Sequence, residues 1–186
     1  PTGKPAAEMT KGGPKPSEIL TEAAFRNAIV MLQAIGGSTN GVVHLSALAG
    51  RTPHKITLET YDEVGRTTPV LVDLKPTGQH YMEHFHQAGG VPRLMQELRD
   101  LLALDAQHVA GGTLGDAIKT FEDVPGQTVI RSRNAPLKSE GGLVVLRGNL
   151  APRGAVLKQG AAAAKLMQHE GRALADGLER VAPGGG

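Results

Sequence analysis

The stretch Pro69-Val70-Leu71-Val72-Asp73-Leu74-Lys75-Pro76-Thr77-Gly78 decides the fold class of this chain. Residues 69–74 form a nearly continuous apolar run that ends shortly before a second proline. The length and the branched side chains of this run are typical of a strand that is buried on both faces. Such strands occur in parallel sheets that are covered by helices. The stretch therefore predicts an α/β fold with polar residues at the carboxyl end of a buried strand.

Helical patterns precede this stretch. Apolar residues recur at helical spacing after Thr21, a typical N-cap, and we expect this helix to end at Gly36-Gly37. Ser38-Thr39-Asn40 then caps a second helix, and Gly50 ends it. A capping box that begins at Thr60 predicts a third, short helix.

After the stretch, mostly helical patterns continue to residue 121, and the pattern becomes strand-like after the candidate boundary at residues 122–127. We expect helices over residues 78–88, 92–101 and 113–121, and strands over 107–110, 128–131, 143–147 and 155–158. The predicted fold is therefore the C-terminal part of an α/β domain over residues 1–122, followed by the start of a β-barrel-like domain over residues 127–186. The second domain is expected to be incomplete, because three strands cannot close a barrel.

The composition excludes several classes of site and partner. The 186 residues include no cysteine, which rules out a disulfide scaffold and an iron–sulfur cluster held by thiolates of this chain. A net charge of +2 and an aromatic content of 3% provide neither a basic stripe nor a stacking platform, so we expect no nucleic-acid partner. No apolar stretch reaches the about 20 residues that cross a bilayer, and no leader pattern is present. We therefore expect a cytoplasmic protein with no membrane partner.

The turn Gly36-Gly37-Ser38-Thr39-Asn40 is the first candidate site. Glycines before a helix start leave backbone N–H groups exposed, and hydroxyls add donors, so such a turn favours a carboxylate or phosphate oxygen. The alternative is an ordinary helix cap. His44 follows one helical turn after Asn40 and either faces the same pocket or is a buried core histidine.

A second candidate site follows the predicted strand. Asp73, Lys75 and Thr77 stand at its carboxyl end, where open α/β sheets bind their ligands. The alternative is a salt-bridged loop. His80 and His84 have the i,i+4 spacing of metal ligands on a helix, but no third ligand is evident, so no metal site is expected there.

Several blocks of the sequence resemble the dihydroxy-acid dehydratase / phosphogluconate dehydratase family. In chain order they are Ile35–Asn40 with His44-Leu45, Pro69–Gly78, His86–Pro92, Gly142–Pro152 and Gly154–Lys158. They follow the family's order and extend roughly over residues 17–173. The block over residues 161–173 is more similar to the sugar-acid branch.

This resemblance implies a hydro-lyase that removes water from a 2,3-dihydroxy acid, either a branched-chain dihydroxy acid or a sugar acid, to give a 2-keto acid. Family members use an iron–sulfur cluster and Mg²⁺, place the site between an α/β domain and a β-barrel-like domain, and assemble as homo-oligomers. The family's cluster cysteines lie upstream of the matched blocks. We therefore expect this chain to be a central fragment that holds no cofactor and is inactive alone.

The same resemblance, together with the two candidate sites, assigns substrate-binding positions but no catalytic residue and no metal ligand. The substrate-binding positions are Ser38, Thr39, Asn40, Asp73, Lys75 and Thr77, with His44, His86 and Asn149 as supporting positions around them. Lys75 would neutralise the substrate carboxylate, so the two candidate segments should meet at one cleft. The alternative function is a non-catalytic module that binds a carboxylate or sugar acid and retains only the fold core.

Overall fold

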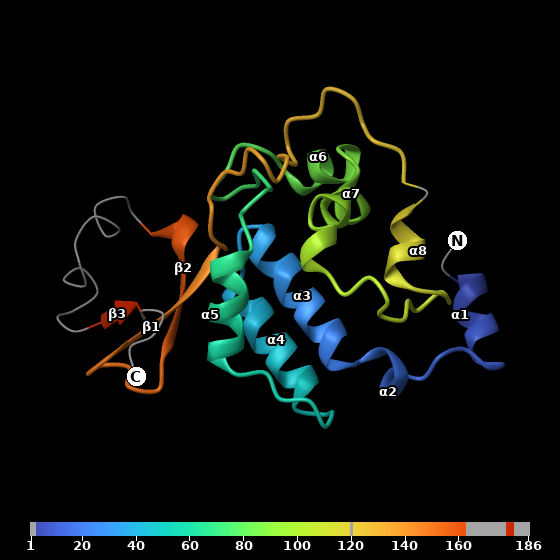
Figure 1. The fold of residues 1–186 in the computed structure, drawn as a ribbon, viewed down its shortest axis with the longest axis horizontal. Coiled ribbons are helices and arrows are strands. Elements are labelled where there is room, and N and C mark those ends of the chain that lie inside the picture. Colours follow the sequence, from blue (N-terminus) through green and yellow to red (C-terminus); the bar gives the residue numbers. More distant parts are fainter. Residues whose placement is uncertain (1–2, 120, 163–177, 181–186) are drawn as a thin grey trace.

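The computed structural model describes residues 3–119, 121–162 and 178–180. The helices are α1 (Gly3–Met9), α2 (Pro16–Ile19), α3 (Glu22–Ala34), α4 (Thr39–Ala49), α5 (Leu58–Thr67), α6 (Met82–Gln87), α7 (Gly90–Glu97) and α8 (Leu114–Lys119), with 3₁₀ turns at Arg99–Leu101 and Gln159–Ala161. The strands β1 (Leu143–Gly148), β2 (Ala155–Lys158) and β3 (Leu178–Arg180) form an antiparallel sheet in the order β2-β1-β3 (Figure 1). Helices combined with a small sheet confirm a mixed α/β architecture. The barrel-like second domain is not confirmed by this sheet.

Local capping signals set the starts of α3 and α4, as predicted. The hydroxyl of Thr21 accepts a hydrogen bond from Ala24 N at 3.2 Å, and that of Ser38 accepts one from Gly41 N at 3.4 Å. Helix α5 begins earlier than predicted, because Thr57 rather than Thr60 is its N-cap. The Thr60 hydroxyl accepts a hydrogen bond from Thr57 N at 3.4 Å, which is the role of the third helical residue in a capping box.

The segment over residues 70–74 is buried and extended, but the prediction of a parallel strand is wrong. Its ladder consists of isolated bridges: Val70 with Lys138 and Val72 with Ile130, both antiparallel, and Leu74 with His80, parallel. Leu71 N donates instead to Ala34 O at the end of α3, at 2.9 Å. An apolar run indicates burial, but it does not show which segments will satisfy the backbone.

Three further predicted elements also differ from the structure. Helix α6 starts at Met82 rather than at Gly78, since Asp73 holds the preceding residues: its carboxylate accepts from Gln79 N at 3.1 Å and its backbone carbonyl from His80 N at 3.2 Å. The strands predicted over 107–110 and 128–131 each reduce to a single bridge, at Gln107 and at Ile130.

At the start of α8, hydrogen bonds from Lys119 and Thr113 hold the pKa of Asp116 well below its usual range. This cap fixes the start of the helix at Leu114, one residue later than predicted.

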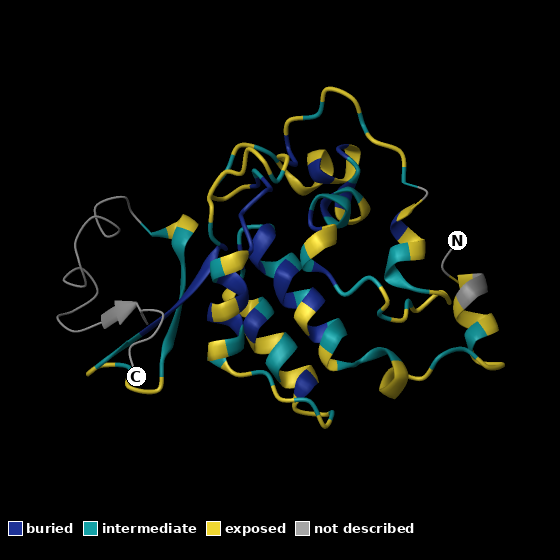
Figure 2. Ribbon diagram, viewed as in Figure 1, coloured by how far each residue is buried: buried dark blue, intermediate teal, exposed yellow. Residues whose placement is uncertain are grey.

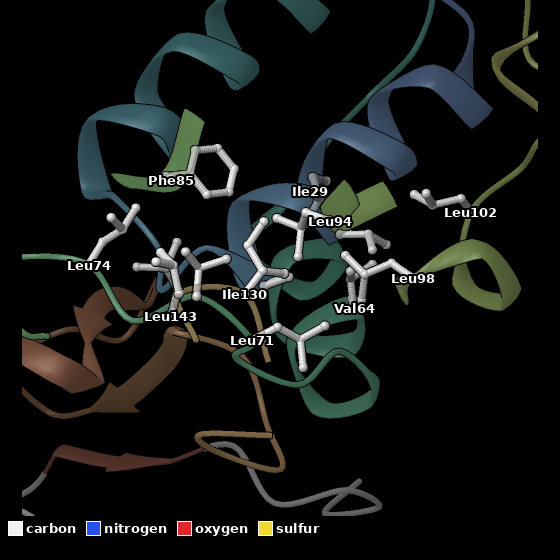
Figure 3. Packing of buried hydrophobic residues seen from close by; sticks show 14 of the residues in the cluster. Ile29, Val64, Leu71, Leu74, Phe85, Leu94, Leu98, Leu102, Ile130 and Leu143 are labelled. Atoms are coloured by element: carbon white, nitrogen blue, oxygen red, sulfur yellow. The ribbon is translucent and has the colours of Figure 1, made fainter. Parts of the chain in front are cut away.

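The core lies where α3, α5 and α7 meet the segment over residues 70–74 (Figures 2 and 3). It is aliphatic for the most part, with members that include Ile29, Val64, Leu71, Leu94, Leu98, Ile130 and Leu143. Tyr61 is its largest fully buried side chain, and its hydroxyl donates to Val42 O at 3.2 Å. Burial raises the pKa of Tyr61, and a hydrogen bond with Ser46 opposes that shift.

Two buried polar side chains join the sheet to the helices. Gln33 of α3 accepts from Leu143 N and donates to Tyr61 O, both at 2.9 Å. Asp62 of α5 accepts from Val145 N at 3.4 Å and pairs with Arg66 at 2.6 Å. Strand β3 pairs only with residues 146–148, so these side chains satisfy the part of the β1 edge that β3 leaves open.

The connection between the helical part and the sheet is attached to α7 by ion pairs. Arg93 Nη2 lies 2.6 Å from Glu97 Oε1, and Arg93 Nε lies 2.8 Å from Asp123 Oδ1. The second contact is an ion pair whose geometry is not that of a hydrogen bond. Glu97 also accepts from Arg133 N at 2.9 Å, and Arg133 pairs with Asp100 at 3.1 Å. Within residues 3–119, 121–162 and 178–180, no helix has the length and apolar character needed to span a membrane.

Candidate functional site

A cavity of about 220 Å³ lies where three parts of the chain meet. They are the end of α3, the segment over residues 70–78, and the residues just before β1 and just after β2. Residues from the helical part and from the sheet part line it: Gly36, Val70, Val72, Asp73, Leu74, Thr77, Gly78, Leu137, Lys138, Gly142 and Gly160. Ligand sites are preferentially found at such junctions. This cavity is therefore our candidate binding site.

Glycines allow the backbone segments to approach each other around the cavity. A Cβ atom at Gly142 would overlap the Gly36 backbone, and one at Gly78 would lie 2.6 Å from Leu74 N. A Cβ atom at Gly160 would lie 3.2 Å from the Thr77 methyl group. The walls of the cavity thus depend on the absence of side chains at these positions.

Asp73 and Thr77, two of the residues predicted to bind substrate, both line the cavity. One carboxylate oxygen of Asp73 accepts from Gln79 N at 3.1 Å, and the other lies 3.8 Å from the His80 ring nitrogen. The Thr77 hydroxyl donates to Leu74 O at 3.4 Å, which is long and leaves its acceptor capacity for a ligand. The cavity therefore contains a carboxylate and a hydroxyl from one loop.

Lys75 lies outside the lining of the cavity. Its ammonium group donates to the Tyr81 hydroxyl at 2.7 Å and lies 4.0 Å from the centre of the Tyr81 ring. Both contacts direct the side chain along the start of α6. No ion pair between Asp73 and Lys75 is found among the described residues; the salt-bridge partner of Asp73 in this loop is His80.

The turn before α4 contributes only Gly36 to the cavity. Gly36 N and Gly37 N donate back to carbonyl groups of α3, at 3.2 and 2.9 Å, so the amides expected to bind an anion instead end the helix. Ser38 caps α4, and Thr39 and Asn40 are exposed in its first turn. The structure therefore does not place these three residues in the lining of the cavity.

The supporting positions lie farther away. His44 is exposed on α4, and His86 is exposed on α6. Asn149 is exposed directly after β1, at the opposite end of the strand from Gly142. Their predicted roles around the site stay predictions.

Lys138 lines the cavity and was not among the candidates from sequence. Its backbone forms the bridge with Val70, which places it at the wall of the cavity. One sequence signal points to it: a lysine that stands shortly before the pair Gly141-Gly142, at the start of a recognisable block. That signal becomes informative only once Val70 and Lys138 are known to pair.

His80 lies beside Asp73 at the cavity, and His84 follows it at i,i+4 spacing. The rings of His80 and His84 form a T-shaped contact with centroids 5.6 Å apart, but His84 accepts a hydrogen bond from Tyr81 N at 3.2 Å and His80 precedes the helix. In the part of the chain that the structure describes, no group of three histidine, aspartate, glutamate or cysteine side chains could hold a metal ion.

Two family models match the chain in succession. Residues 1–117 match the model described as Dihydroxy-acid/6-phosphogluconate dehydratase N-terminal, and residues 128–179 match the corresponding C-terminal model. The cavity is lined by residues from the first match, such as Gly36 and Asp73, and from the second, such as Lys138 and Gly142.

Individual members of this family are similar in sequence to this chain over almost its whole length. The L-arabinonate dehydratase of Rhizobium leguminosarum bv. trifolii is 46% identical over 175 residues, which cover 93% of this chain and 30% of the relative. The L-arabonate dehydratase of Azospirillum brasilense is 47% identical over 90% of this chain and 29% of the relative. A dihydroxy-acid dehydratase of Methanosarcina barkeri is 40% identical over 98% of this chain and 34% of the relative. The chain thus spans about a third of the length of these relatives.

Proposed function

Since the chain belongs to the dihydroxy-acid/6-phosphogluconate dehydratase family, we propose that it serves in a hydro-lyase that converts a 2,3-dihydroxy acid to a 2-keto acid. The observation that carries this proposal is one cavity lined by residues from both family matches. A sugar acid is the preferred substrate class, because two of the relatives are named for arabonate. A purely non-catalytic module is not favoured, since these relatives are named dehydratases.

The cavity suits a small polyhydroxy acid. Its volume of about 220 Å³ is below the range of about 300–1,000 Å³ that is usual for drug-sized ligands. The Asp73 carboxylate accepts hydrogen bonds from substrate hydroxyls, and the Thr77 hydroxyl can donate or accept. The apolar side chains of Val70, Val72 and Leu74 exclude water along one wall, which strengthens these polar contacts.

The iron–sulfur cluster and Mg²⁺ used by the family do not fit the residues of this chain. It contains no cysteine, and its described residues bring no metal-binding group together. We therefore assign substrate binding to this chain and derive no catalytic step within it. We also propose that residues 1–122 are the C-terminal part of an α/β domain and that residues 127–186 begin a barrel-like domain. The enzyme in which the chain serves is proposed to be homo-oligomeric and cytoplasmic.

Direct binding tests the proposed function. We expect the chain to bind L-arabonate saturably in a calorimetric titration, with amide chemical-shift changes centred on the cavity, at Gly36, Asp73, Thr77 and Gly142. The uncharged L-arabinitol should bind at least about tenfold more weakly, because it lacks the carboxylate. The absence of binding, or shift changes confined to other surfaces, would contradict the proposal.

Turnover by this chain alone is not expected. After anaerobic incubation with iron, sulfide and Mg²⁺, the chain should give no 2-keto acid from L-arabonate above the rate without protein. The reason is that no thiolate is available to hold a cluster that would polarise the leaving hydroxyl. Formation of keto acid that depends on added iron would overturn this expectation.

A further inference from the structure

Two ionisable residues, Asp73 and Lys138, are among those that line the cavity; Asp73 is half-buried and Lys138 is exposed at its rim. The Asp73 carboxylate is already engaged with Gln79 N and lies near His80. The Lys138 ammonium makes no hydrogen bond or ion pair with any residue that the structure describes. A lysine ammonium carries three N–H donors, so the full donor capacity of Lys138 is available to a ligand.

The backbone of Lys138 is fixed although its side chain is free. Val70 N donates to Lys138 O at 3.0 Å, and the neighbouring Leu137 N donates to Val70 O at 2.9 Å. Val70 is 7% exposed and itself lines the cavity. The Cα atom of Lys138 is therefore anchored at the cavity wall, and only side-chain rotamers must be ordered on binding.

The other candidate cation is committed elsewhere. Lys75 donates to the Tyr81 hydroxyl and lies over the Tyr81 ring, and it would lose both contacts if it turned toward the cavity. Lys138 has no such contact to lose. Lys138, which lies in the second family match, is therefore the cation that can bind a ligand without losing an existing contact.

We propose that Lys138 binds the carboxylate of the substrate acid, an inference that rests on the proposed function. An ammonium–carboxylate contact is a charge-assisted hydrogen bond, which is among the stronger polar contacts. Asp73 in the same cavity repels a carboxylate and accepts from hydroxyls. The two charges thus orient the ligand, with its acid end at Lys138 and its hydroxyl groups toward Asp73 and Thr77.

The test compares single substitutions in the full chain by calorimetric titration. Lys138→Met should weaken L-arabonate binding at least about tenfold, whereas the weaker binding of L-arabinitol should change less than about twofold. Lys138→Arg keeps the charge and should recover most of the affinity. The matched control is Lys55→Met, which removes an exposed lysine that does not line the cavity and should leave the affinity within about twofold of wild type. Lys75→Met tests the competing cation from the other candidate segment.

Salt dependence provides a second readout. Raising the salt concentration from about 50 mM to about 500 mM should weaken L-arabonate binding to wild type more than binding to Lys138→Met, because the ionic contact is screened. Equal affinities of wild type and Lys138→Met, or a loss confined to Lys75→Met, would overturn the assignment of Lys138 and leave the proposed function intact. A wild-type chain that binds no L-arabonate would overturn both.

Discussion

Gln33→Ala is expected to lower the free energy of unfolding by about 3–5 kcal/mol. The side chain is fully buried and satisfies Leu143 N and Tyr61 O at once. Its removal leaves a donor and an acceptor without partners, and it also opens a void between Gly65 and Gly141, which contact the amide group. Urea unfolding followed by circular dichroism measures the change.

Two further variants separate the causes of that loss. Gln33→Met keeps most of the volume and should cost about 1–3 kcal/mol, which reports the unsatisfied hydrogen bonds alone. Gln87→Ala is the matched control, since Gln87 is exposed at the end of α6, and it should change stability by less than about 0.5 kcal/mol. Equal stabilities of Gln33→Ala and Gln87→Ala would show that the link between α3, α5 and β1 is not formed as described.

Gly142→Ala is expected to cost about 3 kcal/mol or more and to abolish binding of L-arabonate. The new methyl group would overlap the backbone of Gly36, and backbone atoms cannot move aside as a flexible side chain can. The end of α3 and the start of β1 would have to separate, and both form walls of the cavity. Thermal unfolding and a titration with L-arabonate measure the two effects.

Gly50→Ala is the control for this substitution. Gly50 ends α4 with an ordinary φ of −62°, and a Cβ atom there would meet carbonyl oxygens at 3.4 and 3.5 Å, which is normal contact. Its stability should stay within about 0.5 kcal/mol of wild type. A Gly142→Ala chain as stable as Gly50→Ala would contradict the close approach of the two segments.

Features determined by neighbouring residues could be predicted from the sequence. Thr21 and Ser38 cap α3 and α4 because a hydroxyl needs only the amide three residues later, and β1 and β2 follow from short apolar runs between turn residues. The predicted parallel strand over residues 69–74 failed for the opposite reason. Its partners are Ala34, Ile130 and Lys138, and the choice of partner is a property of the folded chain.

The candidate site shows the same division. Asp73 and Thr77 are candidates from sequence because they follow the buried segment directly, and both line the cavity. Lys75 belongs to the same loop, but Tyr81 holds it away, a contact that spacing does not reveal. Lys138 comes to the cavity only through its pairing with Val70, which no pattern within either segment indicates.

The way in which Gln33 and Asp62 cover β1 has a consequence for solubility. An unpaired strand edge is a template for addition of a strand from another molecule, which is how aggregates grow. Where β3 does not reach, side chains from two helices occupy Leu143 N and Val145 N, so an incoming strand finds no free donors there. One of the two edge strands of the sheet is β2, whose four residues end in a lysine, and a short edge strand that carries a charge is a poor template. The helices thereby block strand addition at this part of β1.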